Sequence, residues 1–595
     1  MSAYAAFFSN DEDDPKYEIP FHNSVLLKEP VSCSSFRLSI ENSIHTSSSI
    51  FLGLRCDDYI VVNGSFELRV LRGGCLLNNA HHIDENDAHK IITSNFQSSP
   101  VICSTKSRLN MSTSRLLPSF DTVIELRNLD TGIEGINDIL DGISPMYYTP
   151  TTNYTFELVH EERETVFGIY YDAATTKLLD SLSASLCKKS EPPQSVLIFG
   201  ASNCGKSTFA KALCNNVVKT TQNPIALMDL DPSRSELSVP GCLSLTVIDE
   251  PNFGSFFPSP WCYDKENDLQ YYFGFGSPLD QPLRFCQGLR TLLDHYNDHV
   301  SPKGIPLVIN TPGWTRGFGR ELLEEILDNI SPSHLVYFSH NNAINIDNYE
   351  PDMFEAQDNP DDEILAGFSF SKITTLRGVR RVSGFTQSQL QMHDKMVYFH
   401  QRKVGAFDFS DRLLSRSPLR LNYERSGDIT NPAFVGASAI SVLDYEMDSN
   451  VNPRDIKLLV DSCVMAMCLV EEKSFTAHVL PERHEFKGLP RVFHGSSISH
   501  MNPRFLSLCI IQSINTEEGF FNVYVPGDPS QLSTAILDAA DSRLVLVRGE
   551  GEIPKAEILH PRLLGRNLPY VDFETRAKIG GVWKIRHNIR RKNQQ

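Results

Sequence analysis

One stretch of this 595-residue sequence decides its fold: Ser195-Val-Leu-Ile-Phe-Gly-Ala-Ser-Asn-Cys-Gly-Lys-Ser-Thr208. It joins a short apolar run to a Gly-x-x-x-x-Gly-Lys-Ser loop, and the residues that follow have the composition of a helix. A strand that turns through such a loop into a helix presents backbone N–H groups and the helix N-terminus to phosphate groups. The sequence therefore predicts a binding site for a nucleoside triphosphate.

The residues of this loop have separate predicted roles. Its two glycines permit positive φ angles and a close approach of the backbone to a ligand. Lys206 is expected to reach the β- and γ-phosphates, and the Ser207 hydroxyl is expected to bind Mg²⁺. The predicted nucleotide-binding residues are Gly200, Ala201, Ser202, Asn203, Cys204, Gly205, Lys206, Ser207 and Thr208.

Two carboxylates follow the next predicted strand, Ile225-Ala-Leu-Met-Asp-Leu-Asp231. Carboxylates at the carboxyl end of a parallel strand beside a phosphate loop lie next to the metal. We expect Asp231 to orient the metal or to accept the proton of an attacking hydroxyl, with Asp229 in support. The alternative is that one of the two carboxylates caps the turn that begins at Pro232.

A third predicted strand, Leu307-Val-Ile-Asn310, leads directly into Thr311-Pro-Gly-Trp314. An indole at a strand end is a stacking platform for a nucleotide base, and the Thr311 hydroxyl can hydrogen-bond a phosphate. The alternative is a tryptophan that covers the core of the sheet.

A cluster of arginines lies between Ser371 and Phe385. Arg377 and Arg381 are four residues apart, and Arg380 is three from Arg377, so a helix would place them on one face. A basic helix above a nucleotide site would act as a lid that neutralises charge on the transferred phosphoryl group. The alternative is a solvated surface helix.

Composition is that of an ordinary soluble globular protein, with 41% hydrophobic and 22% charged residues. The net charge of −18 argues against a general nucleic-acid coat protein, whose affinity comes from clustered Lys and Arg. The thirteen cysteines show no zinc-like spacing, which favours a reducing compartment, the cytosol or the nucleus. No stretch approaches membrane-spanning length, so we expect no membrane association.

The predicted organisation has four parts. They are a disordered acidic N-terminus (1–30), a β-rich N-terminal domain (31–184), an α/β P-loop domain with a parallel sheet (185–414) and a β-rich C-terminal domain with a basic tail (415–595). Within the N-terminal domain, Asn63-Gly64 predicts the turn of a β-hairpin.

Together these motifs resemble those of the polynucleotide 5′-hydroxyl kinases. The resemblance is carried by the phosphate loop, Leu230-Asp-Pro with Pro240-Gly241, Asn310-Thr-Pro-Gly-Trp314 and the arginine cluster. It is closer to the nucleolar Grc/Nol-type branch, which acts in ribosomal RNA maturation, than to the Clp-type kinases. It extends to Asp57–Gly73 and Val582–Lys592 and covers most of the chain.

The resemblance implies that the chain transfers the ATP γ-phosphate to the 5′-hydroxyl of RNA or DNA. The residues with implied roles are Lys206, Asp231, Arg377 and Arg381 in catalysis, Ser207 and Asp231 in binding Mg²⁺, and Thr311 and Trp314 in holding the acceptor strand.

One position departs from the family pattern. Relatives commonly carry Asp-Pro-Gly-Gln, whereas this chain has Asp231-Pro-Ser-Arg234. The departure leaves open a catalytically weak, ATP-bound scaffold of an RNA-processing complex. A nucleotide-hydrolysing switch is a more distant alternative, because it leaves Trp314 and the arginine cluster unexplained.

The resemblance also implies a partner, a Las-type endonuclease that cleaves internal spacer 2 of pre-ribosomal RNA and leaves the 5′-hydroxyl. It implies a higher-order hetero-complex in the nucleolus. The tail from Trp583 to Lys592 combines an aromatic anchor with basic residues and is the expected contact. A generic basic tail for RNA contact or nuclear import is the alternative.

Overall fold

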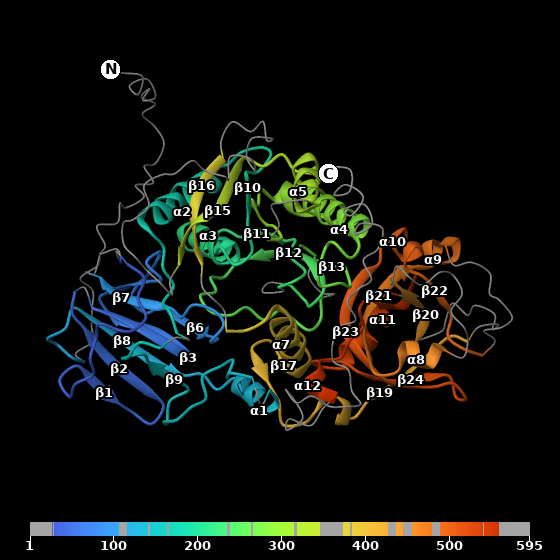
Figure 1. The fold of residues 1–595 in the computed structure, drawn as a ribbon, viewed down its shortest axis with the longest axis horizontal. Coiled ribbons are helices and arrows are strands. Elements are labelled where there is room, and N and C mark those ends of the chain that lie inside the picture. Colours follow the sequence, from blue (N-terminus) through green and yellow to red (C-terminus); the bar gives the residue numbers. More distant parts are fainter. Residues whose placement is uncertain are drawn as a thin grey trace, which may run out of the picture.

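The structure is a computed structural model. It describes residues 27, 29–56, 58–105, 116–140, 143–163, 166–234, 238–262, 266–313, 318–345, 373–380, 384–425, 436–443, 455–478, 488–539 and 541–558. Three large sheets lie side by side, with the central sheet between an N-terminal and a C-terminal one (Figure 1). The predicted basic tail, and all but a few residues of the predicted acidic N-terminus, lie outside the described residues.

The N-terminal sheet has nine strands in the order β1-β2-β8-β3-β7-β4-β5, with β6 and β9 also paired to β3. These strands are β1 (Ser43–His45), β2 (Ser49–Leu54), β3 (Tyr59–Arg72), β4 (Gly74–Leu77), β5 (His81–Ile83), β6 (Ala88–Ile92), β7 (Val101–Thr105), β8 (Thr122–Asn128) and β9 (Phe156–Leu158), and the short helix α1 (Ile136–Ile139) follows β8. All of the pairs within this sheet are antiparallel.

The predicted hairpin turn at Asn63-Gly64 is wrong, because β3 runs straight through it. Gly64 has φ +116°, and a Cβ there would lie 2.5 Å from the Thr155 carbonyl oxygen. The buried Asn63 accepts a hydrogen bond from the Thr93 hydroxyl. The glycine is therefore required where β9 approaches the strand and β3 exchanges pairing partners, and no turn forms.

The central sheet confirms the predicted α/β P-loop fold. Its order is β13-β12-β11-β14-β10-β15-β16, in which β11, β14, β10, β15 and β16 are parallel and the edge strands β12 and β13 are antiparallel. The strands are β10 (Ser195–Gly200), β11 (Ile225–Asp229), β12 (Cys242–Ile248), β13 (Leu269–Tyr272), β14 (Leu307–Asn310), β15 (His334–Asn345) and β16 (Ile373–Arg380). The helices are α2 (Ala173–Leu186), α3 (Lys206–Thr221), α4 (Pro282–His295) and α5 (Phe318–Asn329).

Alternate residues along the central strands enter different cores. Val196 and Ile198 of β10 pack with α2 and α3, whereas Leu197 and Phe199 pack with α4 and α5. Because both faces of the sheet are covered, its strands are continuous apolar runs. This pattern is why the strands could be recognised in the sequence.

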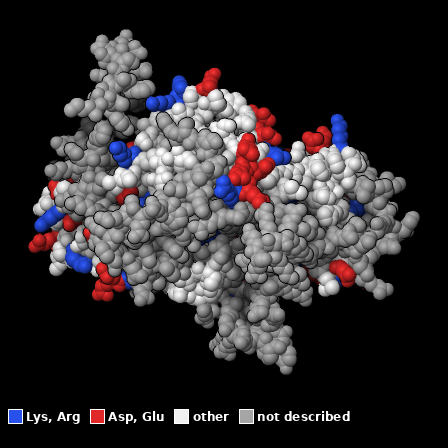
Figure 2. All heavy atoms as spheres, turned by 45° about the horizontal axis from the view of Figure 1, so that its top comes forward, with Lys and Arg blue, Asp and Glu red and all other residues white. Residues whose placement is uncertain are grey.

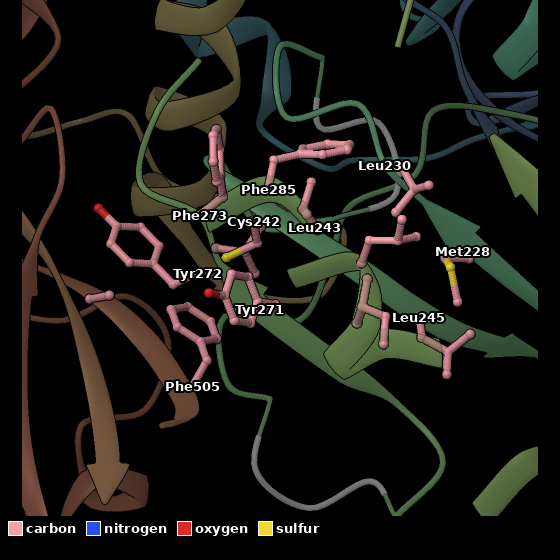
Figure 3. Close-up of a cluster of buried hydrophobic side chains, with 14 of the residues drawn as sticks. Met228, Leu230, Cys242, Leu243, Leu245, Tyr271, Tyr272, Phe273, Phe285 and Phe505 are labelled. Atoms are coloured by element: carbon pink, nitrogen blue, oxygen red, sulfur yellow. The ribbon is translucent and has the colours of Figure 1, made fainter. Parts of the chain in front are cut away.

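The C-terminal sheet has the order β19-β24-β23-β21-β25-β20-β22. Its strands are β19 (Leu419–Asn422), β20 (Ala437–Val442), β21 (Cys463–Glu471), β22 (Val492–His494), β23 (Arg504–Asn515), β24 (Phe520–Tyr524) and β25 (Ser542–Arg548), with helices α8 (Ile456–Val460), α9 (Glu472–His478), α10 (Gly495–Ser499), α11 (Ser530–Asp538) and α12 (Lys555–Ile558). Phe505 of β23 stacks on Tyr272 of β13 with ring centroids 6.1 Å apart (Figure 3). One continuous apolar core therefore joins the central and C-terminal sheets.

Helix α7 (Gln387–His400) connects the parts, and the small ribbon of β17 (Gln401–Lys403) and β18 (Ala406–Phe407) follows it. The helix begins at a capping box formed by Thr386 and Gln389. At its other end, the fully buried His400 lies 2.8 Å from the carboxylate of Glu557 in α12. This contact fixes the last described helix of the chain to α7.

All thirteen cysteines lie within the described residues as free thiols. No helix in the described part of the chain combines the length and the apolar character needed to cross a bilayer. On the described part of the face in Figure 2, acidic and basic side chains alternate in small groups and form no broad basic surface.

The N-terminal sheet contacts the central one through two histidines. The ring centroids of His81 and His89 lie 5.1 and 4.9 Å from that of Phe253. His81 Nδ1 also lies 2.6 Å from Asn216 Oδ1 of α3. Burial, the largest cause, and the nearby Lys219 ammonium together lower the pKa of both histidines to about 4.

These two histidines predict a loss of stability in mild acid. An unfolded histidine has a pKa of about 6.5, so between about pH 6.5 and 4 the unfolded chain binds protons that the folded chain excludes. Stability is therefore retained above pH 6.5 and falls as the pH decreases. Thermal unfolding midpoints between pH 7 and 4.5 should fall less steeply in the double variant His81→Gln/His89→Gln than in the wild type. The exposed His500→Gln is the control, and equal slopes for all three proteins would contradict the prediction.

Candidate nucleotide and acceptor-strand site

The phosphate loop has the predicted strand–loop–helix geometry between β10 and α3. Gly200 has φ +145°, and a Cβ there would lie 2.5 Å from the Phe338 carbonyl oxygen of β15. Gly205 has φ +94° at the N-cap of α3. Both glycines are thus fixed by geometry, and together they let the chain turn from the sheet edge into the helix.

Lys206 is buried at the first turn of α3. Its Nζ donates to the Ala201 carbonyl oxygen at 2.8 Å, inside the loop. Burial lowers the pKa of Lys206, and the nearby Asp231, Cys204 and Asp229 partly offset this effect. The ammonium therefore lies against the loop and near both predicted carboxylates, as a group that clamps phosphates requires.

Asn310, the last residue of β14, connects these groups, and sequence reasoning missed it. Its Nδ2 donates to Asp229 Oδ1 at 3.0 Å and to Ser207 Oγ at 3.3 Å. The amide thus links the end of β11 to the first turn of α3. The signal in the sequence was an asparagine that ends a buried strand, at the sheet edge where ligands bind in parallel α/β folds.

The two carboxylates are placed differently. Asp229 ends β11 and is buried, whereas Asp231 lies beyond the strand and is half-buried. Asp231 Oδ1 accepts hydrogen bonds from both the backbone N–H and the hydroxyl of Ser233. The turn-capping alternative is therefore observed for Asp231, which nevertheless lines the same cleft as Lys206.

The oxygen groups around Ser207 fit a magnesium ion. Asn310 Oδ1 is buried and has no hydrogen-bond partner among the described residues. It belongs to the same side chain that touches Ser207 and Asp229. Hydroxyl, carboxylate and amide oxygens are the ligands that Mg²⁺ prefers.

A cleft of about 730 Å³ opens from the phosphate loop. The N-terminal sheet, the loop after β11, helix α7 and the C-terminal part all contribute to its walls. The residues that line it include Phe96, Lys206, Lys211, Asp231, Arg234 and Gln387. A cleft of this size accommodates a nucleotide together with part of a second substrate.

Known proteins match the chain over this region and beyond it. The family model described as mRNA cleavage and polyadenylation factor CLP1 P-loop matches residues 200–401. The polynucleotide 5′-hydroxyl-kinase GRC3 of Debaryomyces hansenii is 30% identical, over 94% of this chain and 88% of that protein. The chain belongs to the polynucleotide 5′-hydroxyl-kinase GRC3 family.

Other members of this family are similar over comparable lengths. The GRC3 proteins of Candida albicans and Saccharomyces cerevisiae are 28% and 26% identical, over 95% and 92% of this chain and 87% of each relative. A chain in the structure of the wild-type Clp1p–Pcf11p complex aligns at 13% identity with a TM-score of 0.48, over 84% of this chain and 98% of that one. The predicted kinase family is confirmed.

The resemblance implies two residues that hold the acceptor strand, Thr311 and Trp314, and the structure describes only Thr311. Thr311 is buried, and its hydroxyl donates to the Ile198 carbonyl oxygen at 3.0 Å, so in this structure it fastens β14 to β10. Gly313 packs directly on the phosphate loop, where a Cβ would lie 2.1 Å from Ser202 Oγ. Trp314 lies outside the described residues.

The predicted arginine helix is wrong for Arg377, which lies in strand β16 and is exposed. Ile373-Thr-Thr and Val379 supply β-branched residues, and β16 completes the sheet by parallel pairing with β15. Gly378 packs beside the phosphate loop, where a Cβ would lie 3.0 Å from Cys204 Cβ. Successive residues of a strand face opposite sides, so Arg377 lies on the other face of β16 from this contact, and it is not among the described residues that line the cleft. The Arg380 side chain and Arg381 lie outside the described residues.

The Asn310 contacts predict a metal-dependent defect. Asn310→Ala removes the donor that orients both Ser207 and Asp229, and loss of such a supporting contact reduces metal affinity roughly ten- to a hundred-fold. ATP titrations should therefore show a large loss of affinity with Mg²⁺ and a small one in EDTA. Asn137→Ala, which removes an amide with several hydrogen bonds in the N-terminal part, is the matched control. An equal loss with and without Mg²⁺ would show that Asn310 only supports the fold.

Proposed function

We propose that this chain is an ATP-dependent kinase that phosphorylates the 5′-hydroxyl of RNA, or of DNA. Membership of the GRC3 family supports the reaction class. The observation that carries the proposal for this chain is a convergence at the end of the phosphate loop: Lys206 and Asp231 line one cleft, and Asn310 joins Asp229 to Ser207. That end opens into a cleft large enough for an acceptor strand.

The reaction is a direct transfer. The acceptor oxygen attacks the γ-phosphorus, its proton passes to the Asp231 carboxylate, and the bond from phosphorus to the β–γ bridging oxygen breaks as ADP leaves. Lys206 holds the β- and γ-phosphates throughout. The family resemblance implies that Arg377 and Arg381 would neutralise the charge that develops on the γ-phosphate.

Mg²⁺ would be held by Ser207 with Asp229, Asp231 and the Asn310 amide oxygen, and it would neutralise charge on the phosphates. Asn310 orients the first two of these groups. The buried Asp229 has its Oδ1 occupied by hydrogen bonds from Asn310 and from the Asp231 N–H. The Oδ1 of Asp231 is occupied in the same way by Ser233, so exposure is what separates the two carboxylates: Asp231 is half-buried and lines the cleft, which favours it as the group that receives the proton.

The acceptor strand would be held by the loop that follows β14, with Trp314 stacking on the terminal base. Thr311 would act as a positioning residue, since its hydroxyl anchors that loop to Ile198. Stacking on an aromatic ring is worth about 1–3 kcal/mol per base.

The biological setting is part of the same proposal. The kinase would act in a nucleolar hetero-complex with a Las-type endonuclease and phosphorylate the 5′-hydroxyl left by cleavage in internal spacer 2 of pre-ribosomal RNA. The resemblance of the motifs to the nucleolar branch supports this setting. The basic tail from Trp583 to Lys592 is the proposed contact with the nuclease.

Transfer of labelled γ-phosphate from ATP to a 5′-hydroxyl RNA oligonucleotide tests the activity. Lys206→Ala and Asp231→Ala should each reduce kcat/KM by about 10²–10⁴-fold, as expected when an electrostatic clamp or a general base is lost. Lys177→Ala, an exposed lysine on α2, is the control and should retain activity. If the wild-type protein binds ATP but the RNA acquires no label, the result would instead support the catalytically weak scaffold.

Removal of residues 583–595 tests the partner. The truncated chain should retain transfer to free RNA, because the described residues that line the cleft extend only to Glu550. It should lose binding to the Las-type nuclease in a co-purification experiment. If a full-length variant in which the basic residues of the tail are replaced by acidic ones still binds the nuclease, the proposed contact is contradicted.

A further inference from the structure

We infer that Arg234 and Phe96 form a subsite for the nucleotide that follows the 5′-terminal one in the acceptor strand. The inference rests on the proposed function and extends it. It explains how this chain would select a polynucleotide over a single nucleoside, and it gives a role to the arginine that departs from the family pattern.

The position of Arg234 relative to the reacting groups is the first reason. It comes three residues after Asp231, and both side chains line the cleft with Lys206. Its guanidinium carbon lies 5.8 Å from the centroid of the Phe96 ring, within cation–π range. The loop is held in place because Gln387 of α7 donates to the Ser233 carbonyl oxygen at 2.9 Å.

The polarity of the cleft is the second reason. In the proposed reaction Lys206 holds the γ-phosphate and Asp231, in the same cleft, receives the proton of the attacking hydroxyl, so the hydroxyl would arrive on the Asp231 side. The strand behind the hydroxyl would then continue past the residues that follow Asp231, where Arg234 and Phe96 line the same cleft. Lys211 of α3, which also lines the cleft, would be left to the donor nucleotide.

Phe96 is supported as a rigid platform. It makes edge contacts with Tyr147, Phe385 and His393, whose ring centroids lie 6.2, 6.1 and 4.7 Å away. The Tyr147 hydroxyl lies 2.9 Å from His393 Nε2. These three rings are buried, whereas Phe96 is half-buried. A ring that is fixed from behind and exposed in front loses little entropy when a base stacks on it.

The chemistry of the pair fits one nucleotide. A guanidinium binds a phosphodiester through paired N–H donors, and a phenyl face stacks on any base. The small cavity behind the pair, about 40 Å³, also touches Phe96 and Arg234 but has room for only a few waters. The base would therefore lie on the cleft side of Phe96, and recognition would be independent of its identity.

Equilibrium binding of 3′-labelled 5′-hydroxyl RNAs of one to four nucleotides to the full chain, without ATP, tests the subsite. Arg234→Gln should weaken binding of the tetranucleotide roughly ten-fold and reduce the slope of log K against log salt by about 0.7, the value for one phosphate of a single strand. Phe96→Leu should weaken it by a similar factor without changing the slope. Neither variant should change binding of the mononucleoside or of ATP.

Arg420→Gln is the matched control. Arg420 lies over the Phe520 ring at 4.0 Å on the exposed face of the C-terminal sheet, so the change removes the same charge and the same kind of contact away from the cleft. It should leave RNA binding unchanged. A thermal midpoint of Arg234→Gln equal to that of the wild type would exclude a folding defect.

The possible results separate this inference from the proposed function. Unchanged tetranucleotide binding by Arg234→Gln, or equal losses for the mononucleoside and ATP, would overturn the subsite even if the wild type transfers phosphate. Length-dependent loss of binding would support the subsite even if the wild type transfers none, in which case the kinase proposal fails alone.

Discussion

The turn at Gly200 is the constraint on which the site depends. At this residue β10 lies against the Phe338 carbonyl oxygen of β15 so closely that no side chain fits, and φ is positive. The chain leaves the sheet there and starts α3 only six residues later, which places Lys206 and Ser207 at the ends of β11 and β14. Asn310 then joins the three segments through two hydrogen bonds. The loop conformation and the chemistry of the site thus follow from the packing of neighbouring parallel strands.

The cleft exists because three sheets are fastened around that turn. His81 and His89 bring the N-terminal sheet onto Phe253, while the Tyr272–Phe505 stack joins the central core to the C-terminal sheet. The buried His400–Glu557 contact holds α7, which carries residues of the cleft wall. Since every wall comes from a different segment, the acceptor site is a property of the assembled chain and not of the phosphate-loop domain alone.

The sequence was most informative where structure is local. The strand, loop and helix around the Gly-Lys-Ser motif could be predicted because burial on both sheet faces leaves continuous apolar runs between glycines. Prediction failed where pairing between segments that are distant in the sequence decides the structure. Arg377 is spaced from the neighbouring arginines as in a helix, but it lies in β16 because β15 offers a free edge for pairing. Asn63-Gly64 looks like a turn in the sequence, but β3 continues through it because the missing side chain of Gly64 leaves room for β9. Asn310 was missed because its role appears only when β11, β14 and α3 meet.

The charge of the chain explains why short-range contacts must select the acceptor. With a net charge of −18, the protein as a whole repels a polyanion, and salt screens this repulsion beyond about 10 Å. Inside the cleft, attraction is available from the cations that line it, Lys206, Lys211 and Arg234. A cation that stands on an aromatic ring binds phosphate and base together, which a neutral amide at position 234 would not do. In the proposed subsite, the arginine that departs from the family pattern would tighten binding of the strand.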